Sequence, residues 1–233
     1  MYILEGNIGA GKSTFLKLIQ QRLPHIGIAL EPLHNWQKQV YGQSLLANFY
    51  ENPERWAFSM ETFAMMCRVR EHIAEQKQPN QLRIIERSIY SGHYCFTLNG
   101  YKRGFMTDTE WNLYNEWFKF LIPNKCNPPH GFIYLQTDPT VAHKRLKKRN
   151  RLAEKKISPA YLRQIHEHHE SFLIHKDGLL PELKTIPVLI LDCNEEFEAN
   201  EKKLLQHFDV LQEFLLSTQP SATAKAPTTS CSL

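Results

Sequence analysis

The chain has 233 residues, of which 42% are hydrophobic, and a formal net charge of +4 at neutral pH. This size suits one domain with a sizeable core and requires no second domain. The basic residues concentrate between Lys144 and Lys156, which favours a local anion site and argues against a surface that binds nucleic acid.

Cysteine usage and hydropathy favour a reduced compartment and a soluble protein. The five cysteines contain no C-x-x-C pair, and no apolar run approaches the length that spans a membrane. Since the first motif begins at residue 6, we also expect no signal or transit peptide. The expected location is the cytoplasm, without a membrane partner.

The first motif is a glycine-rich loop. A short apolar run, 1–4, leads into Gly6-Asn7-Ile8-Gly9-Ala10-Gly11-Lys12-Ser13, and helical spacing of apolar residues follows. Glycines let backbone N–H groups approach a polyphosphate closely, and the helix points its positive end at the same anion. Lys12 would reach the outer phosphates, and the Ser13 hydroxyl would join the shell of a magnesium ion. The alternative, a plain turn ahead of a helix, requires no Lys-Ser pair.

Two further strands are predicted to deliver acidic side chains to the same sheet edge. The apolar run 26–30 ends at Glu31-Pro32, and the run 82–85 ends in Glu86-Arg87-Ser88. Because ligands bind at the carboxyl ends of parallel strands, Glu31 could act as a general base. Many glutamates at strand ends only cap or pair, so its position leaves both roles open.

Helical spacing recurs over 43–49, 53–73 and 108–121. The second of these segments carries Glu61, Ala64 and Arg68 on one face, and spacing alone does not decide between solvent and a ligand pocket. The third is rich in aromatic residues, with Asp108 as its candidate cap. We interpret the aromatic stripe as packing, either in the core or between the helices of two subunits.

A fourth strand, 131–135, is followed by a basic helix that ends in Arg145-x-x-x-Arg149-x-Arg151. Guanidinium groups suit phosphate oxygens, and a mobile lid that carries arginines would neutralise the charge that develops in phosphoryl transfer. A solvated basic helix is the alternative.

The next helix, 159–175, contains a histidine cluster that resembles a metal site. His166, His169 and Glu170 share a face, but metal ligation needs a further ligand and a defined geometry. Packing is therefore the favoured interpretation.

A fifth strand, 187–191, and an amphipathic helix, 197–216, complete the predicted domain, 1–216. Polar and small residues dominate 217–233, which predicts a flexible tail. Five short strands that alternate with helices predict an α/β fold of three layers with a five-stranded parallel sheet.

Taken together, these motifs resemble the deoxynucleoside kinases of the cytidine, guanosine, adenosine and mitochondrial-thymidine type, from Tyr2 to about Phe214. The matching motifs are 6–14, Glu31-Pro32 with Trp36, Tyr50-x-x-Pro53-Glu54-Arg55-Trp56, Glu86-Arg87-Ser88-Ile89-Tyr90-Ser91, the lid arginines, Glu154, Tyr161 and 166–170. The resemblance implies a fold like that of P-loop NTPases. It also implies transfer of the γ-phosphoryl group of ATP to the 5′-hydroxyl group of a deoxynucleoside, with Mg²⁺ as cofactor, in a homodimer.

The same resemblance implies a role for each motif residue. The catalytic residues would be Glu31, Arg87 and Lys12. ATP would contact Gly6, Asn7, Ile8, Gly9, Ala10, Gly11, Lys12, Ser13, Thr14, Arg145, Arg149, Arg151, Glu196 and Phe197. The deoxynucleoside would contact Glu31, Trp36, Tyr50, Glu61, Ala64, Arg68, Arg87, Gly92, Phe96 and Glu154. Magnesium would be attended by Ser13 and Glu86.

Glu61 departs from the family pattern, which usually has glutamine at this position. An ionised carboxylate only accepts hydrogen bonds, and guanine presents two adjacent donors, N1–H and the N2 amino group. A good bidentate contact of this kind discriminates between bases by about 1–3 kcal/mol. Arg68 could donate to guanine O6, and Gly92 adds room where the cytidine and purine enzymes often have aspartate. The family glutamine normally meets another part of the guanine edge, so the base would have to shift.

We therefore expect a purine, especially deoxyguanosine, as the preferred substrate, with a preference for deoxycytidine or broad specificity as the alternative. A nucleoside monophosphate kinase would share the phosphate loop and an arginine lid but has no use for a carboxylate base beside the acceptor. A nucleotide-binding module without turnover would have no obvious use for Lys12, Glu31, Arg87 and the lid arginines.

Overall fold

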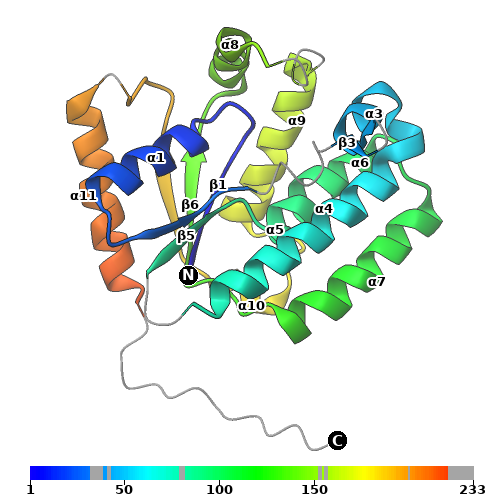
Figure 1. The fold of residues 1–233 in the computed structure, drawn as a ribbon, viewed down its shortest axis with the longest axis horizontal. Coiled ribbons are helices and arrows are strands. Elements are labelled where there is room, and N and C mark those ends of the chain that lie inside the picture. Colours follow the sequence, from blue (N-terminus) through cyan, green and yellow to red (C-terminus); the bar gives the residue numbers. More distant parts are fainter. Residues whose placement is uncertain are drawn as a thin grey trace, which may run out of the picture.

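The computed structural model describes residues 1–31, 39–40, 43–78, 82–151, 154, 157–198 and 200–219. In this part of the chain a five-stranded sheet forms the centre, with strand order β2-β5-β1-β6-β7 and every pairing parallel (Figure 1). The strands are β1 (Tyr2–Gly6), β2 (Gly27–Ala29), β5 (Arg83–Glu86), β6 (Gly131–Gln136) and β7 (Val188–Asp192). The predicted α/β fold with a five-stranded parallel sheet is confirmed.

Strand β1 lies in the middle of the sheet, and all of its residues are buried. A parallel strand that is covered on both faces reads as a continuous apolar run, as the chain does here. The chain moves to one side of β1 for β2 and β5 and to the other side for β6 and β7. Ligands bind beyond the carboxyl ends of the strands at such a reversal of strand order, so the fold directs attention to the loop after Gly6.

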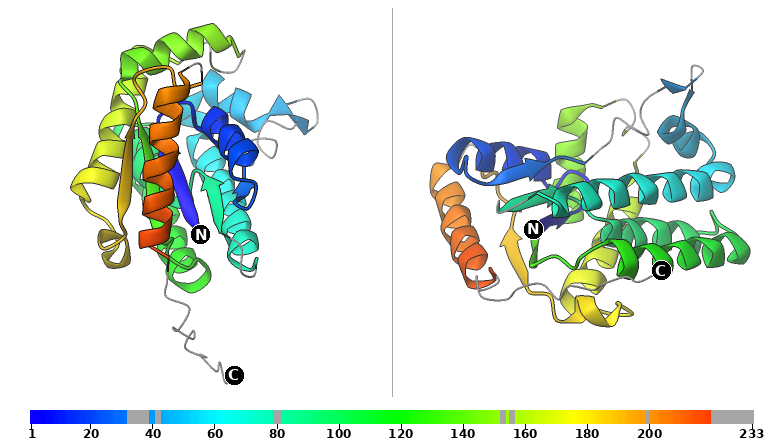
Figure 2. Two further views of the ribbon diagram at one scale, coloured as in Figure 1. Left: turned by 90° about the vertical axis from the view of Figure 1, so that its left-hand side faces the viewer. Right: turned by 60° about the horizontal axis from the view of Figure 1, so that its bottom comes forward.

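Helices cover both faces of the sheet and complete three layers (Figure 1, Figure 2). They are α1 (Lys12–Arg22), α3 (Leu45–Glu51), α4 (Pro53–Gln76), α5 (Ile89–Ser91), α6 (Leu98–Lys102), α7 (Asp108–Lys125), α8 (Pro139–Arg149), α9 (Pro159–Glu170), α10 (Pro181–Lys184) and α11 (Glu201–Ser217). Tyr2 and Leu4 pack against α1 and α11 on one face, whereas Ile3 packs against α4 and α7 on the other. Side chains alternate along a strand, so β1 joins both hydrophobic clusters.

Capping residues set several helix ends. The prediction that Asp108 caps α7 is wrong, because the Thr107 hydroxyl accepts a hydrogen bond from the Glu110 N–H at 3.2 Å. The Glu110 carboxylate bonds back to the Thr107 N–H at 2.9 Å, which makes a reciprocal capping box. The last helix, predicted over 197–216, begins only at Glu201, because Asn200 caps it.

Several short features were not predicted, among them the short helices α5, α6 and α10. Strands β3 (Gln39–Val40) and β4 (Gln43–Ser44) form a small antiparallel pair, so the helix predicted over 43–49 begins at Leu45. The segments Gly92–Thr97 and Ser171–His175 are π-helical turns. Two-residue strands are too short to show a period, and π-helical turns depend on what packs around them.

The aromatic residues of α7 lie in two different environments. Tyr114 and Phe118 are buried in the core, as the packing interpretation predicts. Trp117 and Phe120 are 51% and 57% exposed, and α4, which lies beside α7 (Figure 1), carries exposed apolar residues as well. This surface, formed by Phe63, Met66, Leu113, Trp117 and Phe120, is called the α4/α7 face below.

None of the helices in the described ranges combines the length and the apolar character needed to cross a bilayer.

Candidate active site

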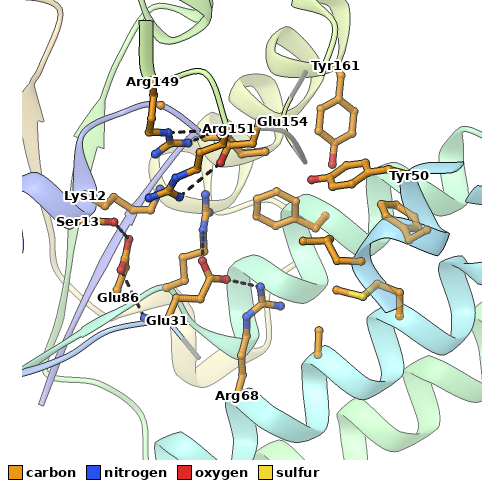
Figure 3. A pocket seen from close by; sticks show the side chains of 18 of the residues that line it. Lys12, Ser13, Glu31, Tyr50, Arg68, Glu86, Arg149, Arg151, Glu154 and Tyr161 are labelled. Atoms are coloured by element: carbon orange, nitrogen blue, oxygen red, sulfur yellow. Dashed lines mark hydrogen bonds and ion pairs between the residues drawn. The ribbon is translucent and has the colours of Figure 1, made fainter. Parts of the chain in front are cut away.

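A pocket opens at the carboxyl ends of β1, β2 and β5 (Figure 3). Its walls come from the loop after β1, from Glu31, from α3 and α4, from the segment after β5, and from Arg149, Arg151 and Glu154. It is called the first pocket below. The parallel register brings these distant segments together, since strands that run in one direction end at one edge.

The loop over 6–14 is called the phosphate loop below. The conformations of its glycines and a side-chain hydrogen bond fix its shape. Gly9 and Gly11 have φ angles of +83° and +96°, and a Cβ atom on Gly9 would lie 2.6 Å from the Ala142 carbonyl oxygen of α8. Glycine is therefore required at this position by both conformation and space. The Asn7 side chain donates to the Leu162 carbonyl oxygen at 2.8 Å, which ties the loop to α9.

Lys12 is almost completely buried beneath this loop. Its ammonium group donates to the carbonyl oxygens of Gly6 and Asn7, at 3.0 and 2.8 Å. Burial, together with the nearby charge of Arg87, lowers the pKa of Lys12 to about 7. Burial and Arg87 thus disfavour the charged form of Lys12. An anion bound next to the ammonium group would stabilise this charged form.

Ser13 and Glu86 lie together at the start of α1. The Ser13 hydroxyl donates to Glu86 Oε1 at 2.9 Å, and the Glu31 N–H reaches Glu86 Oε2 at 3.4 Å. Hydroxyl and carboxylate oxygens suit Mg²⁺, which usually takes one or two protein ligands and completes its shell with water and substrate phosphates. Within the described residues no group of three or more His, Cys, Asp or Glu side chains could hold a metal ion. The pair Ser13 and Glu86 thus fits an ion that arrives with its phosphate ligand.

The histidine-rich helix packs against the sheet. His169 is fully buried, its Nδ1 lies 2.7 Å from the Ile165 carbonyl oxygen, and its ring stacks on Tyr134. Glu170 accepts hydrogen bonds from Tyr134 and Gln136, at 2.6 and 3.0 Å. These contacts give the cluster a structural role.

Glu31 is the buried carboxylate at the centre of the first pocket. Its Oε1 accepts from Arg68 at 2.7 Å, and its Oε2 lies 3.3 Å from Arg87 Nε. Burial alone would raise the pKa of Glu31, but the charges of Arg87 and Arg68 together lower it below the ordinary value. The carboxylate form therefore predominates at neutral pH.

Arg87 is held in an unusual conformation. Its φ angle is +62°, a region that non-glycine residues rarely adopt and that often marks functional sites. Its guanidinium lies over the ring of Phe96, with 4.7 Å between Cζ and the ring centroid. Arg87 Nη1 is buried and has no hydrogen-bond partner among the described residues. A donor of this kind is available for a bound ligand.

The end of the first pocket away from the phosphate loop is apolar, and it is called the apolar end below. It is lined by Leu46, Phe49, Met60, Ala64 and Phe96. Glu61 and Arg68 add charged groups from α4. An apolar enclosure with a few polar groups is the usual form of a site for a flat organic ring.

Glu61 receives a hydrogen bond from the Thr97 hydroxyl at 3.0 Å. Burial raises the pKa of Glu61, while Arg68 and the Thr97 hydroxyl oppose this rise. Gly92 does not line the first pocket: a Cβ atom there would lie 2.8 Å from Arg68 Nη1. Arg68 therefore occupies the space that the glycine leaves.

Arg149, Arg151 and Glu154 close one side of the first pocket. Glu154 pairs with Arg149 at 2.5 Å and with Arg151 at 3.6 Å. Tyr50 and Tyr161 point their hydroxyl groups toward each other nearby (Figure 3). Burial and the Glu154 carboxylate raise the pKa of Tyr50 to about 12, so this phenol stays protonated.

A second pocket lies on the other side of the phosphate loop. It is lined by Gly9, Gly11, Thr14, Arg145, Lys148, Arg149, Glu196, Phe197 and Glu198. Arg145 faces this pocket and donates to the carbonyl oxygens of Cys193 and Glu195, at 2.8 and 3.0 Å. Of the three predicted lid arginines, Arg149 and Arg151 line the first pocket and Arg145 does not.

The structure gathers most of the predicted site residues around the two pockets, but Trp36 lies outside the described residues. Sequence analysis missed Leu46, Phe49, Met60 and Thr97. The first three belong to predicted helices whose buried face was not assigned to a pocket. Thr97 gave no signal, because its contact with Glu61 depends on the π-helical turn.

The chain is similar in sequence to known proteins along nearly its whole length. The deoxynucleoside kinase family model matches residues 2–215. The chain is 32% identical over 237 residues to deoxycytidine kinase 2 of Gallus gallus, covering 92% of this chain and 89% of the relative. It is 36% identical over 218 residues to the mitochondrial deoxyguanosine kinase of Xenopus laevis, covering 84% and 82%. It is 32% identical over 235 residues to the deoxycytidine kinase of Homo sapiens, covering 91% and 89%.

Together with the parallel sheet and the phosphate loop, these matches show that the chain belongs to the deoxynucleoside kinase family. It is thus an ATP-dependent kinase.

Proposed function

We propose that this kinase binds a deoxynucleoside in the apolar end of the first pocket and that Glu31 accepts the proton of its 5′-hydroxyl group. The observation that carries the proposal is the position of Glu31, between the phosphate loop and the apolar end, beside Arg87. A hydroxyl group presented to this carboxylate would face the bound γ-phosphate. Loss of its proton as it attacks is the step that a carboxylate base assists.

Arg87 and Lys12 would stabilise the charge that develops on the transferring group. The free Nη1 of Arg87 supplies a donor near Glu31, and Lys12 supplies a cation beneath the loop. Fixed donors in a buried site stabilise such charge strongly, because they need no reorganisation during the reaction. Ser13 and Glu86 would hold Mg²⁺, which when bound neutralises phosphate charge.

The side of the pocket would rearrange when phosphates bind. Arg149 and Arg151 are paired with Glu154 in the structure. Phosphate oxygens would compete for both guanidinium groups, since bidentate contacts to phosphate are strong. Glu154 would then be released toward the 3′-hydroxyl group of the sugar, together with Tyr50. In the second pocket, Glu196 and Phe197 would line the base of ATP, and Arg145 would stay near them.

For the nucleoside base we propose a purine, especially deoxyguanosine. An ionised Glu61 would accept hydrogen bonds from guanine N1–H and the N2 amino group. Arg68, which bonds to Glu31 in the structure, would donate to guanine O6. A preference for deoxycytidine and a broad specificity are the alternatives.

A homodimer that buries the α4/α7 face is the proposed assembly. Five large apolar side chains on this face are at least 43% exposed in the single chain. Large apolar side chains left exposed on two neighbouring helices are typical of a subunit contact. We also propose a kinase domain over 1–216 and a cytoplasmic location, and cell fractionation would test the location.

The reaction is tested by supplying ATP and magnesium with each deoxynucleoside and each deoxynucleoside monophosphate, and identifying the products. We expect deoxynucleoside 5′-monophosphates, and we expect Glu31→Gln to lower kcat by about 10²–10⁴-fold, since it removes the base. Glu213→Gln, an exposed change on α11, is the matched control. Products from monophosphates alone would identify a nucleoside monophosphate kinase. ATP binding without any product would identify a module without turnover.

Lys12 predicts proton uptake when ATP binds. With a pKa of about 7, much of the Lys12 amine is neutral at pH 8. Bound phosphates favour the charged form and raise this pKa, so Lys12 takes up a proton. Calorimetry of ATP binding at pH 8, in buffers with different ionisation enthalpies, should show uptake in the native protein and none in Lys12→Met. Equal uptake in both proteins would show that another group is responsible.

Glu61→Gln should shift preference from deoxyguanosine toward deoxycytidine and deoxyadenosine by about 10–100-fold in kcat/KM. The native preference for deoxyguanosine should fall as the pH decreases through the raised pKa of Glu61, because the protonated carboxyl presents a donor to guanine N1–H. In Glu61→Gln the ratio should not change with pH over this range. A native preference for thymidine, or an unchanged ranking in the variant, contradicts the assignment.

Replacing Trp117 and Phe120 together by glutamate should convert the proposed dimer into monomers, because two like charges on each subunit would be buried at the contact. Sedimentation velocity measures this directly. Leu205→Glu, at a position 47% exposed on α11, is the control and should remain dimeric. A native monomer, or a dimer that survives the double change, rules out this face as the contact.

A further inference from the structure

Both carboxylate oxygens of Glu31 lie against guanidinium groups. Arg68 Nη2 donates to Oε1 at 2.7 Å, and Arg87 Nε lies 3.3 Å from Oε2 (Figure 3). Glu31 and Arg68 are only 10% and 11% exposed, so water screens this pair weakly. The shorter of the two contacts is made by Arg68, which comes from α4 and not from the phosphate side of the pocket.

This pairing makes the Glu31 carboxylate a weaker general base. A carboxylate that is stabilised by two cations binds a proton less readily, since each cation favours the charged form. If both contacts persisted during the reaction, Glu31 would be a weaker acceptor for the hydroxyl proton than the site could provide. Arg87 is placed to act on the transferring group, so Arg68 is the partner that can be exchanged.

The position of Arg68 gives it a second possible partner. Its guanidinium lies at the border of the apolar end, over Gly92, where no Cβ atom occupies the space. A base that enters the apolar end would present its polar edge toward Glu61 and Arg68. A guanidinium group carries five donors in a planar fork, and it could turn to a carbonyl oxygen of the base with little displacement.

We propose that Arg68 is a positioning residue that couples base recognition to Glu31: a nucleoside in the apolar end draws Arg68 away from Glu31 and thereby increases the basicity of the carboxylate as the 5′-hydroxyl group arrives. This inference rests on the proposed function. It makes base recognition part of catalysis, so that a base with a suitably placed carbonyl oxygen raises kcat and does not merely lower KM.

Several other groups act on Glu31 and must be controlled. The charged and titratable groups that face it are Arg68 and Glu61 from α4, Lys12 from α1, Arg87 and Glu86 from the segment at the end of β5, and Tyr50 from α3. Glu61 is the carboxyl whose titration would also contribute to an acidic limb, because burial and the Glu31 charge both raise its pKa. The experiment therefore uses the Glu61→Gln background, in which this carboxyl is absent.

The test compares the acidic limbs of two pH profiles, both at saturating ATP and magnesium. The profile of kcat/KM for the nucleoside reports Glu31 in the nucleoside-free pocket, and the profile of kcat reports it with the nucleoside bound. We expect the kcat limb to lie at higher pH than the kcat/KM limb. In Arg68→Met we expect the kcat/KM limb to move up by about 1 pH unit or more and the separation between the limbs to shrink, because the cation is already absent.

Arg70→Met is the matched control, since Arg70 is on the same helix and exposed. It should leave the separation unchanged, and Arg68→Lys should restore part of it. Coincident limbs in the Glu61→Gln background, or an undiminished separation in Arg68→Met, would overturn the coupling. If Arg68→Met binds nucleoside too weakly for kinetics, NMR titration of ¹³C-labelled glutamate in the nucleoside-free protein measures Glu31 directly, with Glu31→Gln for assignment. An unchanged Glu31 midpoint there would also overturn the proposal.

This outcome can be separated from failure of the proposed function. If Glu31→Gln keeps full activity, the base assignment itself is wrong. If Glu31→Gln loses activity but Arg68→Met keeps the separation between the limbs, only the coupling fails.

Discussion

The parallel pairing of β1 with β5 and β6 is the constraint on which the site depends. It places the end of β1, at Gly6, at the same sheet edge as the end of β5, where Glu86 is the last strand residue and Arg87 follows. Pairing of β2 with β5 then brings Glu31 to the same edge. Three segments far apart in the sequence thus meet at one edge, because strands that run in one direction end together.

A buried contact beneath the sheet edge reinforces this arrangement. Glu5 is fully buried and accepts a short hydrogen bond from the Ser88 hydroxyl, at 2.5 Å. Ser88 also caps α5, so one side chain joins β1 to the segment that carries Arg87. Breaking such a contact would leave a buried carboxyl without its partner, which costs about 1–3 kcal/mol. The positive φ angle of Arg87 is held in place by these neighbours.

The pocket above this edge holds an unusual density of buried charge. Lys12, Glu31, Arg68 and Arg87 are each at most 11% exposed by residue or side chain. A buried charge is unfavourable unless a group of the opposite sign lies close to it. Here Glu31 lies between Arg68 and Arg87, so these side chains partly neutralise one another. A bound polyphosphate and nucleoside would replace some of these pairs. When ligands bind, each charged side chain would therefore exchange a protein partner for a ligand group. This exchange costs less free energy than leaving a buried charge without any partner.

The sequence by itself determined the fold class, the five strands and the phosphate loop, because short apolar runs and glycine spacing are local signals that need no partner. It also placed Glu31, Glu86 and Arg87 at strand ends. Only the tertiary structure decided that Arg68 bonds to Glu31, that Thr97 bonds to Glu61 and that Arg145 faces the second pocket. These contacts join residues 36–48 positions apart, and their side chains had several partners of suitable chemistry within reach. Which partner each one takes depends on the packing of α4, α8 and the π-helical turn around the sheet edge, and no local pattern encodes that choice.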